Sequence, residues 1–235
     1  MNDTIIVGVS GAPVSQRAVD WAVARAASRR QRVELVAVVG GAIGTVGEAS
    51  VIEQARAEAE RLLTAHVERV AGSGVDVTTR VDAGNPVARL VEASEGAALL
   101  VIGSDYRGSG GPVRGAHGIR IAAGAKCPVV VVPDFDTAHR TGVVVGVDGS
   151  PQSEHAVRFA ASEADRLGEK LIAVSVWTPL EAPRNGLAVY PDLYLTNMQA
   201  ATEETQALAL AGVADDYPDL VVERVVERGF PSHIL

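Results

Sequence analysis

Short runs of β-branched residues alternate with longer segments in which apolar residues recur at helical spacing. The first run, residues 4–7, leads into a glycine-containing turn and then into a segment whose Ala18, Trp21 and Ala22 mark one helical face. A second strand is predicted over residues 33–39, directly after this helix. A strand, a helix and a second strand in this order are typical of a parallel pair joined by a right-handed crossover.

The alternation continues as far as residue 132. After the second strand it predicts a long helix, a third strand, a helix opened by Gly84-Asn85-Pro86, a fourth strand, a further helix and a last strand. Apart from the helix that starts at Gly84, these segments cover residues 48–71, 75–81, 98–103, 115–125 and 129–132. Five parallel strands then alternate with four helices, so we expect an α/β fold in which helices cover both faces of an open parallel sheet.

The first part of this pattern occurs twice. Residues 4–39 align without a gap on residues 142–177, at a constant offset of 138 positions (142 minus 4). The aligned pairs include Gly8 with Gly146, Gly11 with Gly149, Pro13 with Pro151, Ala18 with Ala156, and Val38 with Val176. We therefore expect two copies of one domain, residues 1–133 and 142–235, with residues 134–141 as the linker between them.

The second copy follows the first only through its third strand, which is predicted over residues 220–226. Pro231 then corresponds to the proline that opens a helix in the first copy, and Leu235 lies opposite Leu90. The counterpart of residues 91–133 is missing, so we expect the second sheet to lack its last two strands. Because such a sheet leaves an apolar edge and face uncovered, we interpret the end at Leu235 as that of a truncated product.

Charge and composition narrow the choice of partners. Asp and Glu number 29 against 21 Lys and Arg, which gives a formal net charge of -8, so nucleic acid and acidic membrane surfaces are poor partners. No apolar run approaches the length of about 18 residues that a membrane-spanning helix needs, and no charged leader precedes the first strand. We expect a soluble, cytoplasmic protein that binds neither nucleic acid nor membrane.

The most suggestive chemistry follows the predicted fourth strand, because ligands of open parallel sheets bind beyond the carboxyl ends of the strands. Residues 103–117 form a glycine-rich segment, in which backbone N–H groups can approach an anion and the next helix adds its positive N-terminal dipole. We predict a phosphate cradle here, with an empty glycine-rich loop as the alternative. The candidate ligands are Gly103, Arg107, Gly108, Gly110, Gly111, Arg114, Gly115, Ala116 and His117.

Two segments, Val7 to Ser15 and Val145 to Ser153, resemble the opening of the universal stress protein family. Residues 101–104 and 127–132 are similar to the fourth strand and the closing strand of that family, so the resemblance covers nearly the whole chain. The tandem arrangement is similar to the two-domain form found in actinobacteria. The resemblance implies a five-stranded parallel sheet of order 3-2-1-4-5, pairing of copies through the fifth strand and, in one branch of the family, a bound ATP.

The resemblance also implies roles for residues outside the glycine-rich segment. Gly8 belongs to the opening motif and is counted among the nucleotide-binding residues. In the family, an acidic residue after the first strand contacts the nucleotide. That position is occupied by Ser10 in the first copy and by Asp148 in the second. Val38 and Val176 resemble the position in the second strand whose backbone meets adenine.

The ATP-binding motif of the first copy departs from the family's pattern. Gly103 fits the first glycine of that motif, but Tyr106 stands at the second, and Ala116 stands where the family has a phosphate-binding hydroxyl. The missing hydroxyl removes a charge-assisted hydrogen bond, a loss of about 1.5–3 kcal/mol. Direct phosphate contacts from Arg107 and Arg114 would compensate, and solvated surface charge is the alternative for both arginines.

Three functions are open at this point. We expect a non-enzymatic universal stress protein for which an adenine nucleotide, ATP alone or with Mg²⁺, is a regulatory ligand in the stress response. The alternative is a scaffold with a degenerate nucleotide site, which acts as a homodimer or on partner proteins through its sheet edges. An enzyme is least favoured, because the sequence carries no Ser-His-Asp set, no H-E-x-x-H and no G-x-x-x-x-G-K-[ST] motif.

Overall fold

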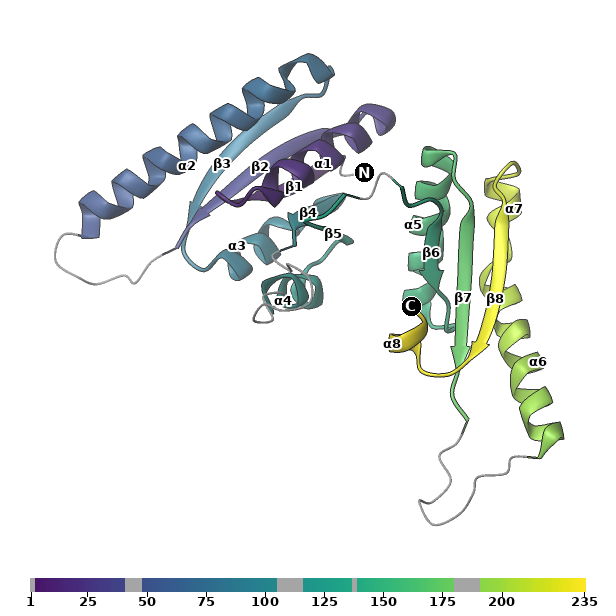
Figure 1. Ribbon diagram of the computed structural model, residues 1–235. Helices are drawn as coiled ribbons and strands as arrows, with labels where there is room; N and C mark the ends of the chain where they lie inside the picture. Colours follow the sequence, from purple (N-terminus) through teal and green to yellow (C-terminus); the bar gives the residue numbers. More distant parts are fainter. Residues whose placement is uncertain (1–2, 41–47, 105–115, 137–138, 180–190) are drawn as a thin grey trace, which may run out of the picture. The chain divides into compact units, whose positions relative to one another are not determined.

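The computed structural model describes residues 3–40, 48–104, 116–136, 139–179 and 191–235. The chain divides into two compact units, Met1–Thr137 and Ala138–Leu235, which we call unit 1 and unit 2. Each unit has its own parallel sheet flanked by helices (Figure 1). The α/β class predicted from the hydrophobic pattern is confirmed.

Unit 1 is built on a five-stranded parallel sheet whose order is β3-β2-β1-β4-β5, and this confirms the expected order. Its strands are β1 (Thr4–Val9), β2 (Arg32–Val39), β3 (Val77–Ala83), β4 (Leu99–Gly103) and β5 (Val129–Val132). Its helices are α1 (Val14–Arg29), α2 (Glu48–Val70), α3 (Pro86–Ala93) and α4 (Ala116–Gly124), with a short 3-10 helix, η1 (Ala71–Ser73).

Successive side chains of the central strands point to opposite faces of the sheet, and helices cover both faces. Ile6 and Val36 belong to one buried cluster with Leu90 of α3 and Ile121 of α4. Neighbouring residues such as Leu35, which is fully buried, point to the other face, where α1 packs on β1, β2, β4 and β5 and α2 packs on β2 and β3. The sheet is thus apolar on both sides along its centre.

The third strand starts two residues later than the sequence pattern predicts, at Val77 instead of Val75. The reason lies in how α2 ends, since η1 adds one tight turn and Gly74 then adopts a left-handed backbone with φ 73°. The chain therefore needs Val75 and Asp76 to reach the edge of β2.

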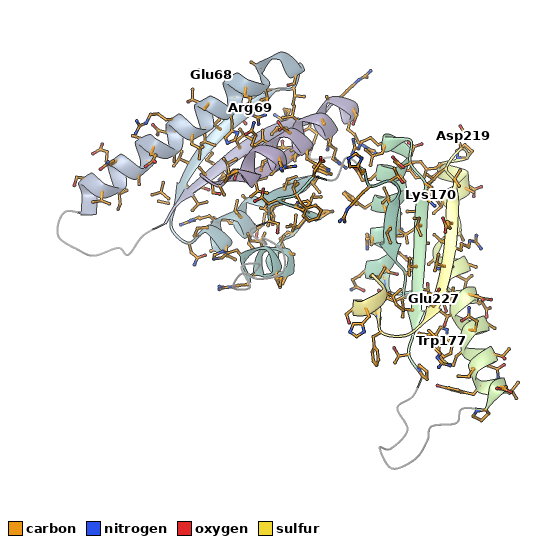
Figure 2. All side chains as sticks on the ribbon, in the orientation of Figure 1. Glu68, Arg69, Lys170, Trp177, Asp219 and Glu227 are labelled. Atoms are coloured by element: carbon orange, nitrogen blue, oxygen red, sulfur yellow. The ribbon has the colours of Figure 1, made fainter. Side chains whose placement is uncertain are left out.

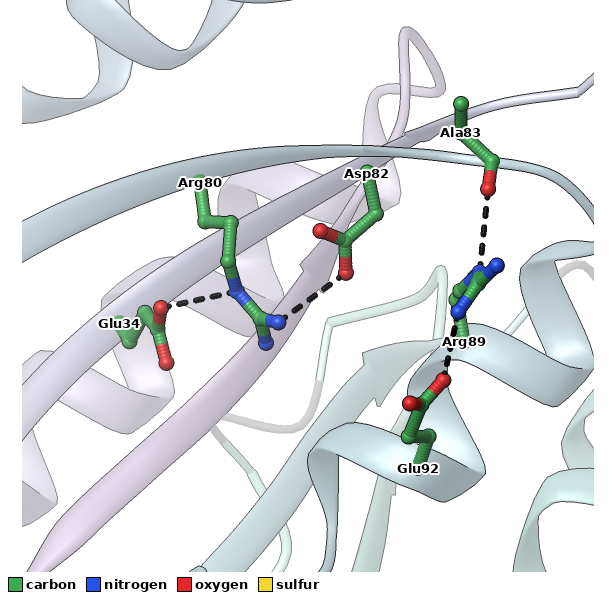
Figure 3. Close-up of polar contacts among 6 residues, drawn as sticks. All are labelled: Glu34, Arg80, Asp82, Ala83, Arg89 and Glu92. Atoms are coloured by element: carbon green, nitrogen blue, oxygen red, sulfur yellow. Dashed lines mark hydrogen bonds and ion pairs between the residues drawn. The ribbon is translucent and has the colours of Figure 1, made fainter.

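Polar contacts hold the β3 side of the sheet and the start of α3, as Figure 3 shows. Arg80 lies between two carboxylates, with its Nε 3.0 Å from Glu34 Oε1 and its Nη1 3.2 Å from Asp82 Oδ2. Arg89 of α3 donates from Nε to the carbonyl oxygen of Ala83 at 3.0 Å. Because Ala83 ends β3, this bond fixes the first turn of α3 beside the carboxyl edge of the sheet.

Unit 2 carries a three-stranded parallel sheet of order β6-β7-β8. Within the described part of the unit, the expected absence of the last two strands is confirmed. The strands are β6 (Val143–Gly146), β7 (Leu171–Trp177) and β8 (Val222–Arg228), and the helices are α5 (Pro151–Leu167), α6 (Asp192–Ala209), α7 (Val213–Asp216) and α8 (Pro231–Ile234). As in unit 1, the third strand starts two residues late, because Leu220 still closes a turn by donating from its N–H to Tyr217 O at 3.1 Å.

One buried amide ties α6 to the sheet of unit 2. Gln206 is only 1% exposed, and its Nε2 lies 3.0 Å from the carbonyl oxygens of both Ala173 and Val225. The same Nε2 lies 3.2 Å from Ser175 Oγ, and this hydroxyl donates to Val147 O at 2.8 Å. The side chain of Gln206 thus supplies donors to acceptors that come from β7 and β8.

The internal repeat is visible in the backbone hydrogen bonds as well as in the strands. In unit 1, the N–H of Gly84 donates to Val39 O at 2.9 Å. In unit 2, the N–H of Gly229 donates to Trp177 O at 3.1 Å, and Trp177 is the residue that aligns with Val39 (Figure 2). The turn from the third strand into the next helix is therefore anchored to the end of the second strand in both units.

Candidate functional site

A pocket of about 260 Å³ opens at the carboxyl ends of β1, β2 and β4 in unit 1. β1 lies between β2 and β4, and the connections on its two sides diverge there, as they do at ligand sites of open α/β sheets. The pocket brings together five of the predicted site residues, Gly8, Ser10, Val38, Gly103 and His117. Its remaining walls come mainly from α1, α3 and α4, through residues that include Val14, Val87, Leu90, Gly118 and Ile121.

Two glycines of the pocket are explained by close packing. A Cβ at Gly103 would lie 2.7 Å from Val14 Cγ1 and 3.2 Å from the Val14 backbone carbon. A Cβ at Gly8 would lie 3.0 Å from Leu90 Cδ1 and 3.1 Å from Ile102 Cγ2. The absence of side chains at these positions lets α1 and α3 approach the strand ends and shape the pocket.

Two hydroxyl groups meet at the mouth of the pocket, where the chain passes from β1 to α1. Ser10 Oγ and Ser15 Oγ are 3.2 Å apart, and Ser15 Oγ also accepts a hydrogen bond from the backbone N–H of Ser10 at 3.0 Å. Ser15 is buried, whereas Ser10 is exposed to solvent. If the Ser15 hydroxyl donates to Ser10, the hydrogen of the Ser10 hydroxyl is left for a bound molecule.

Most of the predicted phosphate cradle lies outside the described residues. This applies to Arg107, Gly108, Gly110, Gly111, Arg114 and Gly115. Ala116 is the first residue of α4, and His117, in the first turn, is exposed and lines the pocket. The predicted phosphate contacts therefore stay predictions, and the structure places the start of α4 beside the candidate site.

Unit 2 has a pocket of about 390 Å³ at the equivalent edge of its sheet. The predicted residues Asp148 and Val176 both line it, together with Gly146. A Cβ at Gly146 would lie 3.0 Å from Leu235 Cδ1, just as a Cβ at Gly8 would lie 3.0 Å from Leu90 Cδ1 in unit 1. The two pockets thus share one plan, and they differ in their polar residues.

Asp148 stands in unit 2 where Ser10 stands in unit 1. Its Oδ1 accepts a hydrogen bond from the backbone N–H of Ser150 at 2.9 Å, and Ser150 caps α5 by accepting from the N–H of Ser153. Hydrogen bonds from Ser150 are the main cause that holds the pKa of Asp148 below its usual value. The carboxylate is therefore ionised at neutral pH and exposed at the pocket.

Sequence reasoning missed several residues of the unit 1 pocket. Ser15 belongs to the segment that resembles the family's opening but is not among the predicted site residues, although its hydroxyl contacts that of Ser10. Pro86 is predicted only to open a helix, yet it lines the pocket together with Val87 of the same helix. The sequence signal that could have found them is the turn Gly84-Asn85-Pro86 directly after β3. A helix that starts there comes back over the carboxyl ends of the strands.

The sequence profile of the universal stress protein family matches residues 1–133 and again residues 140–235. The chain belongs to the universal stress protein family. The two matches agree with the two units and with the repeat seen in the sequence.

Relatives of this universal stress protein align either with nearly the whole chain or with about half of it. Universal stress protein Rv1996 of Mycobacterium tuberculosis is 33% identical over 258 residues, which cover 97% of this chain and 80% of the relative. A universal stress protein of Archaeoglobus fulgidus has the same fold, with a TM-score of 0.70 at 15% identity over 98% of this chain and 78% of its own. A universal stress protein in complex with cAMP is 26% identical over 55% of this chain and 96% of its own, with a TM-score of 0.47.

Two further features of this universal stress protein bear on its chemistry. Within the described residues, no three His, Cys, Asp or Glu side chains are grouped so that they could hold a metal ion. None of the helices that the structure describes has the length and hydrophobicity required to cross a membrane.

Proposed function

We propose that this universal stress protein binds an adenine nucleotide in the unit 1 pocket as a regulatory ligand in the cytoplasm, without turning it over. The observation that carries the proposal is the pocket itself, at the carboxyl edge of the sheet where β1 separates β2 from β4. ATP, alone or as its Mg²⁺ complex, is the first ligand to test. Binding need only favour one conformational or assembly state for the nucleotide to act as a signal.

The dimensions and walls of the pocket support a planar apolar base. Its volume of about 260 Å³ lies near the lower end of the range for small-molecule sites, so adenine and part of a ribose would fill it. The apolar wall is formed by residues that include Val38, Val87 and Leu90. The phosphates would then extend toward Gly103 and the start of α4.

The polar residues of the pocket support binding without catalysis. His117 is the one titratable side chain among the described residues that line it. The Ser10 and Ser15 hydroxyls contact each other, and among the described residues neither hydroxyl is hydrogen-bonded to a histidine or a carboxylate. A serine without such a base is a weak nucleophile.

A scaffold is the second candidate function, and the exposed side chains of unit 1 favour it. Ile119 of α4 is 70% exposed and Val131 of β5 is 43% exposed. Within the described residues β5 pairs only with β4, so its outer side offers unpaired backbone groups to another chain. Homodimerisation or a partner protein at this edge is compatible with nucleotide binding at the pocket.

Replacement of Val38 by Trp tests the proposed function. We expect Val38→Trp to weaken binding of ATP or AMP at least about tenfold in isothermal titration, because the larger side chain occupies the space proposed for adenine. Val144→Trp, on an exposed strand position of unit 2, is the control, and it should leave the affinity within about twofold. Equal affinities of Val38→Trp and the wild type would overturn the unit 1 site, and loss of binding in Val176→Trp alone would place the site in unit 2.

A further inference from the structure

The two pockets of this chain differ in charge at one equivalent position. Among the described residues that line the unit 1 pocket there is no Asp, Glu, Lys or Arg. Among the described residues that line the unit 2 pocket, Asp148 is the one with a charged side chain. Ser10 and Asp148 lie two residues after Gly8 and Gly146, and each of these glycines lines the pocket of its own unit.

In the proposed binding mode, the order of the strands puts this position next to the sugar of the nucleotide. Val38 lies near the end of β2, Ser10 follows β1, and Gly103 ends β4, with β1 between the other two strands. With adenine beside Val38 and the 5′-phosphate toward Gly103, the ribose lies against Ser10. This placement rests on the proposed function.

The chemistry at this position sets which sugar substituents are accepted. An ionised carboxylate only accepts hydrogen bonds, so Asp148 suits the free hydroxyls of a ribose and repels a phosphate attached to it. A serine hydroxyl is neutral and can donate to a phosphate oxygen. The Ser10 hydroxyl is exposed at the pocket mouth and contacts Ser15, whose own oxygen already accepts the Ser10 N–H.

We propose that the unit 1 pocket accepts an adenine nucleotide whose ribose carries a second phosphate on its 2′ or 3′ oxygen, and that Ser10 is the residue that permits it. The unit 2 pocket, with its carboxylate at the same position, excludes this class and accepts only a ribose with free hydroxyls. The two copies of the repeat therefore sort adenine nucleotides by the charge on the sugar.

The test compares an acidic and a neutral replacement of nearly equal size. Ser10→Asp and Ser10→Asn are titrated by calorimetry with adenosine 2′,5′-bisphosphate, adenosine 3′,5′-bisphosphate and 5′-AMP, in the full chain. We expect Ser10→Asp to bind the bisphosphates that the wild type accepts about tenfold more weakly than Ser10→Asn does, because a like charge is brought close to the second phosphate. The affinity of the two variants for 5′-AMP should agree within about twofold, and added salt should narrow the difference for the bisphosphates.

The outcomes separate this inference from the proposed function. If 5′-AMP binds the wild type but Ser10→Asp and Ser10→Asn bind the bisphosphates equally, the role of Ser10 is wrong and nucleotide binding stands. If the wild type binds 5′-AMP but neither bisphosphate, the proposed acceptance of a second phosphate is wrong. If none of the three nucleotides binds the wild type, the proposed function itself fails.

Discussion

Gln206→Glu is expected to unfold unit 2 at much lower denaturant than the wild type, with a loss of about 3 kcal/mol or more in its free energy of unfolding. The Nε2 of Gln206 faces Ala173 O, Val225 O and Ser175 Oγ at 3.0–3.2 Å, and the side chain is 1% exposed. A carboxylate oxygen in that place would face acceptors instead of donating to them. The shape of the side chain hardly changes, so the effect isolates the hydrogen bonds and the buried charge.

The chain allows each unit to be followed separately, because it has one tryptophan in each, Trp21 in α1 and Trp177 at the end of β7. In a Trp21→Phe background, the fluorescence of Trp177 reports urea unfolding of unit 2. Gln54→Glu, an exposed position of α2, is the isosteric control and should change stability by less than about 0.5 kcal/mol. A buried acid takes up a proton more readily than a free one, so the penalty in Gln206→Glu should shrink between about pH 8 and about pH 5. A loss no larger than that of Gln54→Glu would contradict the buried network.

Gly103→Ala is expected to lower the free energy of unfolding of unit 1 by about 1–3 kcal/mol and to weaken nucleotide binding. The added methyl group would lie 2.7 Å from Val14 Cγ1, 3.1 Å from Val14 Cγ2 and 3.2 Å from the Val14 backbone carbon. Rotation of the valine side chain cannot relieve the contact with the backbone carbon, so α1 must move away from β4. Since α1 and β4 both line the pocket, the same movement distorts the candidate site.

The measurement for Gly103→Ala uses Trp21 fluorescence in a Trp177→Phe background, together with calorimetric titration of ATP. Gly72→Ala is the matched control, because a Cβ at Gly72 meets no atom within 4 Å. The control should be neutral or slightly stabilising, since alanine reduces the freedom of the unfolded chain. If Gly103→Ala behaves like Gly72→Ala, the close approach of α1 to β4 is not required in solution.

The fold could be predicted from sequence because the signals were local and repeated. The almost wholly apolar run at residues 98–103 is typical of a buried parallel strand, and the second copy of the pattern agrees with the first. The start of β3 was misplaced by two residues, since the apolar residue Val75 fits a strand pattern equally well. Only the tertiary position of η1 and Gly74 shows that the chain has not yet reached the sheet there.

The candidate site was predictable only in part. Gly8, Ser10 and Val38 were found because strand ends and a family motif pointed to them. The pocket walls from α3 were not, because Pro86 and Val87 follow β3 at the edge of the sheet, and only the return of the chain across the sheet brings them to β1. Gln206 carried no sequence signal at all, since a glutamine on a helix is usually exposed.

The central claim is that an adenine base lies between the end of β2 and α3 in unit 1. Photolabelling of the chain with 8-azidoadenosine 5′-monophosphate, followed by mass spectrometry of the peptides, tests it most directly. We expect the label on the unit 1 peptides that contain Val38 or Val87, and we expect unlabelled ATP to prevent the reaction. Label confined to unit 2, or label that excess ATP does not reduce, would contradict the claim.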